Sequence, residues 1–166
     1  MRTTLKFALA LGAAAAFAAP VQAQITDNID ATATVLQALT VTGDAPLAFG
    51  NIAPSQVKTV AAGAAASGHF SLNGAPGSSV SFRFNALPAN LQIAGLTLSA
   101  WSGLHRDANT AAGATAFVPT AGVAQSVTMN AADGNYFVWL GATLTAAAVV
   151  APGNYTEPIV LEVFYN

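Results

Sequence analysis

The last fourteen residues of the chain, 153–166, have the two-residue period of a β-strand. One face of this strand is almost entirely apolar and is interrupted only by Glu157. Its other members are Tyr155, Ile159, Leu161, Val163 and Tyr165, and Gly153 opens the segment in a turn. Such a strand has to pair with another strand, because an unpaired apolar edge is an aggregation site. The segment therefore predicts a closing strand over 153–166 and a function in strand pairing and assembly.

Shorter segments with the same alternation recur along the chain, and turn residues separate them. No segment after residue 23 shows a sustained helical period flanked by caps. Strands are predicted at 31–35, 39–42, 47–49, 57–61, 69–72, 80–84, 96–101, 116–118, 126–129, 136–140 and 155–165. Short strands without helical crossovers indicate an all-β fold, for which an immunoglobulin-like antiparallel β-sandwich is the leading architecture.

Residues 1–23 have the pattern of a secretory signal peptide. Arg2 and Lys6 provide the positive start, residues 7–19 the apolar stretch, and residues 21–23 the small-residue cleavage pattern. The apolar stretch is too short to span a bilayer as a stable helix, and no later apolar run is long enough. We therefore expect an exported protein in the periplasm, on the cell surface or outside the cell. Its mature chain, 24–166, is expected to be a single β-sandwich domain without a membrane-spanning segment.

The composition narrows the range of partners. Charged residues make up only 7% of the chain, against roughly 25% in soluble domains. There is no cysteine, so the core holds without disulfides or is completed by another chain. Without the signal segment, three basic residues face seven acidic ones, a net charge of −4. Nucleic acid is therefore excluded as an expected partner.

The start of the mature chain carries a second alternating segment, 24–35. Apolar residues occupy alternate positions, and only Asp27 breaks the row. The apolar residues are Ile25, Ile29, Ala31, Ala33 and Val35. A strand of this kind could be donated to a neighbouring subunit, where it would add main-chain hydrogen bonds and apolar side chains. The same pattern would equally serve the first strand of the chain's own sandwich, so both alternatives stay open.

Three motifs carry a family resemblance. They are Pro46-Leu47-Ala48-Phe49-Gly50-Asn51-Ile52, the later Ala151-Pro152-Gly153-Asn154-Tyr155-Thr156, and the final Val163-Phe164-Tyr165-Asn166. With them the mature chain resembles the bacterial secreted domain of unknown function numbered 4402, and more distantly the spore coat protein U domain.

The positions of Gly153 and Tyr165, fourteen residues from the end and next to last, are also similar to those in chaperone–usher pilus subunits. Those subunits have an immunoglobulin-like fold that lacks one strand. Many of them carry a disulfide, which this chain lacks. The resemblance implies a periplasmic chaperone and an outer-membrane usher as partners.

Residues suited to catalysis or metal binding do not form a recognisable motif. His69 and His105 are the only histidines, and neither has metal-ligand spacing to another ligand. The sequence contains no nucleophile elbow or phosphate loop. We therefore predict no enzymatic activity, no metal and no cofactor. The segment 104–110, with His105-Arg106-Asp107, is predicted to be a polar loop with potential for binding.

Two functions follow from these patterns. The leading expectation is a non-enzymatic structural subunit of a bacterial surface filament, pilus (fimbria) or coat, with a role in cell adhesion. It would assemble with copies of itself or with related subunits through β-strand addition. The alternative is a monomeric periplasmic or cell-surface binding module whose loops hold a carbohydrate or a protein partner.

Overall fold

The computed structural model describes residues 27–166. Val35–Asn166 form one compact unit, and residues 27–34 lie outside it. Residues 27–34 contain no helix or strand, and their side chains are exposed. The predicted signal peptide and Ile25 lie outside the described residues, so these predictions stay as they are.

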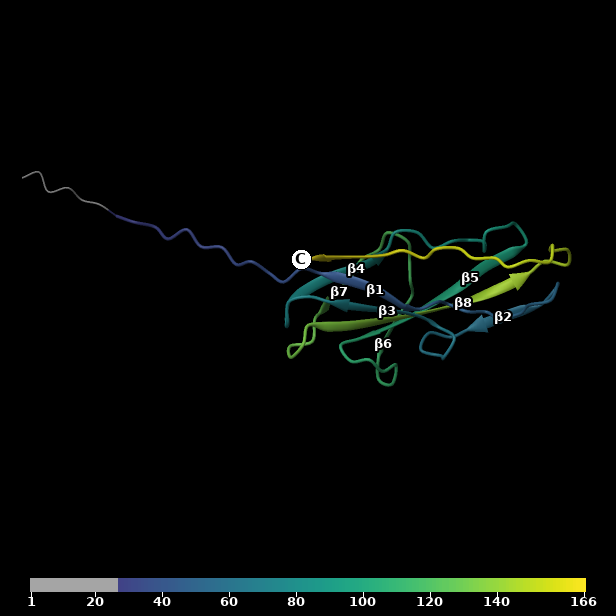
Figure 1. Cartoon of the computed structure of the whole chain (residues 1–166), viewed down its shortest axis with the longest axis horizontal. Helices are drawn as coiled ribbons and strands as arrows, with labels where there is room; N and C mark the ends of the chain where they lie inside the picture. The colour runs from purple at the N-terminus through teal and green to yellow at the C-terminus, as the bar shows by residue number, and fades with distance from the viewer. Residues whose placement is uncertain (1–26) are drawn as a thin grey trace, which may run out of the picture. The chain divides into compact units, whose positions relative to one another are not determined.

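The compact unit is built from β-strands and contains no helix in the described part of the chain. The strands form two sheets, and Figure 1 labels most of them along the compact unit. Their bounds are β1 (Thr40–Ala45), β2 (Val57–Val60), β3 (Gly68–Asn73), β4 (Ser79–Phe84), β5 (Leu96–Arg106), β6 (Thr115–Phe117), β7 (Gln125–Thr128), β8 (Asn135–Ala146) and β9 (Leu161–Tyr165). The prediction of an all-β sandwich is confirmed. Within the described range no helix is long and apolar enough to cross a membrane.

Every pairing between the strands is antiparallel. The larger sheet has the order β1-β3-β8-β5-β6, and β2 pairs with the end of β8 that extends beyond β3. The smaller sheet has the order β7-β4-β9. An immunoglobulin sandwich pairs its strands as ABED and CFG. Here β1, β3, β8 and β5 take the places of A, B, E and D, and β4 and β9 those of C and F. Among the described residues no strand pairs with β9 at the place of G, although β1 lies close to it without a ladder of hydrogen bonds.

The core lies between the two sheets and follows the strand alternation. On β8 the buried inward residues include Tyr136, Val138, Leu140 and Leu144. The first three pack with apolar side chains of β4, including the fully buried Phe82, whereas Leu144 packs with Leu96 and Leu98 of β5. Each of these larger side chains contributes roughly 1.5–3 kcal/mol on burial. This packing fixes the register of the sheets.

A β-bulge divides β5 into two parts. Even-numbered side chains face the core before the bulge, and odd-numbered side chains face it after the bulge. Ser99 pairs with Thr143 and Ser102 with Gly141, so three steps on β5 match two steps on β8. Ala100, inside the bulge, has a φ of 49°. Leu96 and Leu98 face the core before the bulge, whereas the inward residues after it have odd numbers.

Two predicted strands are wrong. Residues 31–35 form no strand, and no described neighbour pairs with them. Residues 47–49 run as a loop, although Leu47 and Phe49 are half-buried against the core. Alternation thus marked their apolar faces correctly but could not supply a partner strand.

The predicted closing strand is too long, because only Leu161–Tyr165 are paired. The partner strand β4 ends at Phe84, opposite Leu161, so residues 155–160 have no continuing ladder on that side. Pro158 also lacks a backbone donor. Conversely, β5 and β8 extend well beyond the predicted 96–101 and 136–140, because they pair with each other on both sides of the bulge. The other predicted strands agree with the structure within a few residues.

Candidate functional site

An apolar groove of about 1080 Å³ opens into the compact unit beside the segment that leads into β9. One wall is formed by residues 43–52 and Pro54, and the other by residues 150–157 and Ile159. The floor consists of core side chains from β5 and β8, with Phe70 of β3, namely Leu96, Leu98, Leu140, Leu144 and Ala146. The groove is therefore lined by strands of the larger sheet and by loop segments, and its wall over 150–159 leads on to β9.

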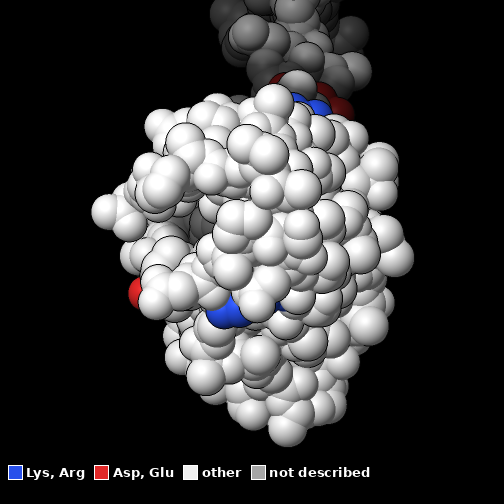
Figure 2. All heavy atoms as spheres, turned by 90° about the vertical axis from the view of Figure 1, so that its right-hand side faces the viewer, with Lys and Arg blue, Asp and Glu red and all other residues white. Residues whose placement is uncertain are grey.

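The groove carries little charge. Among its lining residues only Asp44 and Glu157 are ionisable acids, and both are exposed at the rim. Figure 2 looks onto the end of the sandwich where β8 ends and shows a hollow among uncharged atoms. A site of this composition favours an apolar occupant that satisfies its own polar groups by main-chain hydrogen bonds.

Lys58 holds part of the first wall of the groove, residues 46–54. The Lys58 ammonium group donates to the carbonyl oxygen of Phe49 at 3.3 Å and also to that of Asn51. Ala48 N donates to Ala66 O at 2.9 Å. Leu47, Phe49 and Ile52 pack against the buried Leu96 cluster. This wall belongs to the first resemblance motif, and Lys58 is a residue whose role the sequence did not reveal.

The opposite wall folds around Tyr155. Its hydroxyl donates to Ala151 O at 2.8 Å, and its ring lies against Gly153, where an added Cβ would come within 3.2 Å of the ring. The predicted site residues Gly153, Tyr155 and Ile159 all line the groove. Their backbone forms no strand, and Thr156 N donates to Gln92 Oε1 at 3.4 Å.

The remaining predicted residues of the C-terminal segment belong to β9. Leu161 is buried, and Val163 and Tyr165 pack against the core from the same face. On one side β9 pairs with β4 from Val80↔Tyr165 to Phe84↔Leu161. Its other edge has no partner strand among the described residues. The structure thus places the apolar face of the segment inward and leaves one backbone edge without a paired strand.

The predicted N-terminal residues are not brought to any partner. Ile29, Ala31 and Ala33 are exposed, and Ile29 is 97% exposed. Val35, at the start of the compact unit, is 94% exposed. Their alternative role as the first strand of the chain's own sandwich is absent from this structure, because the first described strand begins at Thr40.

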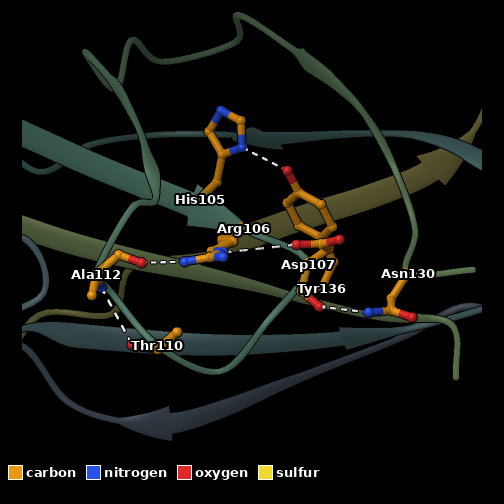
Figure 3. A network of polar contacts seen from close by, with 7 residues as sticks. All are labelled: His105, Arg106, Asp107, Thr110, Ala112, Asn130 and Tyr136. Carbon is orange, nitrogen blue, oxygen red and sulfur yellow. Dashed lines mark hydrogen bonds and ion pairs between the residues drawn. The ribbon is translucent and has the colours of Figure 1, made fainter. Parts of the chain in front are cut away.

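The predicted loop 104–110 is only partly a loop. Leu104, His105 and Arg106 belong to β5, and the bulge turns His105 toward the core. His105 and Tyr136 point toward one another in Figure 3, with 2.7 Å between Nδ1 and the hydroxyl oxygen. The imidazole also lies within 6 Å of the Phe82 and Phe117 rings, at 5.7 and 5.5 Å between centroids. His105 is therefore half-buried, with its ring packed against aromatic side chains of both sheets.

The surroundings shift the pKa values of this pair. Burial lowers the pKa of His105, because the charged imidazolium loses its hydration. Burial, and then the negative charge of Asp107, raise the pKa of Tyr136 to about 12. Asn130 Nδ2 donates to Asp107 O at 3.1 Å, which holds Asp107 beside this pair. The pair is thus neutral around pH 7.

The second histidine lies on the outer face of the larger sheet. His69 stacks on Trp139 with 4.9 Å between ring centroids, and its Nδ1 lies 3.3 Å from Asp44 Oδ2. Within residues 27–166 no three His, Cys, Asp or Glu side chains gather in a way that could hold a metal ion. Among the described residues, neither histidine is hydrogen-bonded to a serine or threonine hydroxyl that it could activate as a nucleophile.

Comparisons with protein-family models, with curated proteins and with solved structures gave no match to this chain.

Proposed function

We propose that this protein is a non-enzymatic structural subunit that assembles by accepting a β-strand from another chain. The strand would lie beside β9, at the place that strand G takes in an immunoglobulin sandwich. The proposal rests on one observation. β9 is paired with a strand on one side only, and the residues just before it in the chain line an apolar groove.

Both parts of the site match the needs of an incoming strand. The free edge of β9 offers backbone groups for a ladder of hydrogen bonds. The groove offers a floor of leucine side chains to alternate apolar residues of the same strand. A small polar ligand would find few partners in this lining. The binding-module alternative is therefore less well supported, since part of its predicted loop belongs to β5 and His105 is engaged by the Tyr136 hydroxyl.

The occupant that we propose is segment 24–35 of a second copy of this chain. It carries apolar residues at alternate positions, and its described side chains are exposed. Twelve residues in extended conformation reach about 40 Å, enough to pass along 155–160 and β9. Because donor segment and acceptor groove differ, the contact is heterologous and leads to open-ended polymers. A surface filament, pilus or coat is such a polymer.

The experiment compares the oligomeric state of mature protein variants by size-exclusion chromatography with light scattering and by electron microscopy. Ile29→Asp should abolish polymers, because it places a charge among the apolar groups of the groove. Thr32→Asp, on the other face of the same segment, is the matched control and should polymerise normally. Both side chains are exposed in the folded chain, so neither variant should lose the fold.

A synthetic 24–35 peptide provides a second measurement, because it should bind the protein that lacks residues 24–30. The proposal is overturned if Ile29→Asp polymerises like the natural sequence, or if the protein forms no polymer and binds no peptide. An export chaperone or a related subunit could donate the strand instead. The protein would then form a stable heteromeric complex in place of homopolymers, and this result would contradict the proposed donor.

A further inference from the structure

The backbone groups on the edge of β9 that faces away from β4 follow from the pairing with β4. In an antiparallel pair the N–H and C=O of one residue point to the same neighbouring strand, and those of the next residue point the other way. Asn166 N donates to Ser79 O at 3.2 Å, and Val160 O accepts from Asn85 N at 3.3 Å. Even-numbered residues therefore point their N–H and C=O groups to the β4 side. The groups that point to the edge without a paired strand belong to Leu161, Val163 and Tyr165.

The same alternation continues back through residues 155–160, although they form no strand. Tyr155 and Ile159 are half-buried and line the groove, whereas Pro158 and Val160 are exposed and do not line it. The even-numbered residues bond to the segment that follows β4. Thr156 N donates to a side chain of this segment, Gln92 Oε1, and Val160 O accepts from its first residue.

The odd-numbered residues of this stretch keep their backbone groups free. The backbone N and O atoms of Tyr155, Glu157 and Ile159 make no hydrogen bond among the described residues. The edge that an incoming strand can pair with therefore begins at Tyr155 and not at Leu161. It is about 36 Å long in extended conformation, against about 17 Å for β9 alone.

Pro158 does not interrupt this longer edge. A proline removes the N–H only on the side to which its nitrogen points. Residue 158 is even-numbered, so its nitrogen points to the β4 side and the outer edge loses no donor. The proline also restricts the preceding residue, Glu157, to an extended conformation, which suits pairing.

The space beside the edge differs along its length. At the far end the Tyr165 hydroxyl donates to Gln37 O at 2.7 Å, just before β1, and β1 lies close to β9. Tyr155, Glu157 and Ile159 instead border the groove with its leucine floor. The stretch before β9 is therefore the part of the edge where an incoming strand finds both space and apolar contacts.

We propose that the incoming strand pairs with the whole edge from Tyr155 to Tyr165, and that residues 155–160 join β9 as one long strand when the groove is filled. This inference rests on the proposed function, in which a second copy supplies the strand. It adds the backbone groups that receive the strand, namely those of Tyr155, Glu157 and Ile159 together with those of β9.

The test moves the proline by one residue. The double variant Glu157→Pro with Pro158→Glu keeps the composition but removes an N–H from the outer edge. Pro158→Ala is the matched control, because it adds an N–H on the other side and residue 158 does not line the groove. Glu157→Gln shows what the loss of the carboxylate alone does. All variants are made in mature protein with Ile29→Asp, so that the acceptor stays monomeric, and the affinity for the synthetic 24–35 peptide is measured.

We expect the double variant to bind the peptide at least roughly fivefold more weakly than Pro158→Ala, the equilibrium factor of one net hydrogen bond. A second measurement uses the mature Ile29→Asp protein without further changes and follows amide hydrogen exchange by NMR. Peptide binding should slow exchange at Tyr155, Glu157 and Ile159 as well as within β9. This measurement decides the question if the double variant does not fold.

The inference is overturned if the bound peptide slows exchange only within Leu161–Tyr165. It is also overturned if the folded double variant binds the peptide as tightly as Pro158→Ala or Glu157→Gln. In both cases the peptide still binds, so the proposed function stands. If the acceptor binds no peptide and the natural sequence forms no polymer, the proposed function itself has failed, and this inference fails with it.

Discussion

The imidazole of His105 and the phenol of Tyr136 share a hydrogen bond of 2.7 Å in the aromatic core between the two sheets. Two strands that are neighbours in the larger sheet, β5 and β8, contribute one group each. Phe82 reaches the imidazole from the smaller sheet and Phe117 from β6. Changes in the charge of either group should therefore act on the packing of both layers.

Stability should fall in mild acid because of His105. Burial lowers its pKa below 6.5 in the folded protein, so the unfolded chain binds the proton more readily. The contribution of His105 is complete above pH 6.5 and is lost as the pH falls through the folded pKa. Urea unfolding across this range should show the loss, and His105→Gln should reduce it. His69→Gln, on the outer face of the larger sheet, is the control, and an equal reduction there would contradict the assignment.

Stability should also fall in alkali, through Tyr136. Its folded pKa of about 12 lies above the ordinary 10.0, so the unfolded chain loses the proton first. The contribution is complete below pH 10 and decreases as the pH rises toward 12. Circular dichroism should follow unfolding together with the ultraviolet absorbance of tyrosinate. In Tyr136→Phe the alkaline loss should become smaller; an unchanged profile would show that other groups determine it.

Gly141→Ala should strongly destabilise the larger sheet. A Cβ at Gly141 would lie 2.4 Å from both Ala62 N and Val60 O, and these are backbone atoms that cannot turn aside. We expect a loss of more than about 2 kcal/mol in the free energy of unfolding, measured with urea. Gly43→Ala is the control, since its nearest neighbour, a Phe70 ring atom, is 3.9 Å away. Equal losses in both variants would refute the steric explanation.

Lys58→Met should loosen the 46–54 wall of the groove. It retains an apolar stem but removes the donor to the carbonyls of Phe49 and Asn51. Hydrogen exchange, measured by mass spectrometry, should accelerate in this wall, and the protein should bind the 24–35 peptide less tightly. Arg83→Met removes the cation that bonds Glu162 at 2.7 Å on the smaller sheet and should change neither. Unchanged exchange in Lys58→Met would mean that apolar packing alone holds the wall.

Much of the fold could be predicted because alternation reports burial directly. The inward faces of β4, β8 and β9 follow from their residue order, and with them the sandwich. Alternation does not report a partner, however. Residues 31–35 and 155–160 have the pattern of strands, yet neither is paired with a neighbouring strand in the described chain.

The site depends on contacts between residues that are far apart in the sequence, and such contacts could not be predicted from local patterns. Tyr165 was identified by its position next to the end, but its bond to Gln37 spans most of the compact unit. Lys58 acts on carbonyl groups seven and nine residues away, for which no side-chain pattern exists. His105 was predicted in a loop, because the inserted residue near Ala100 cannot be recognised from side-chain order.

That inserted residue has a wider consequence for the chemistry of the molecule. If β5 kept Ala100 but ran as a regular strand without the bulge, its second half would exchange its two faces, so that Arg106 would turn toward the aromatic rings and His105 toward water. A permanent cation would then stand where a neutral ring now bonds a phenol. The bulge in one strand, more than the choice of any side chain, thus decides which ionisable group packs among the aromatic rings.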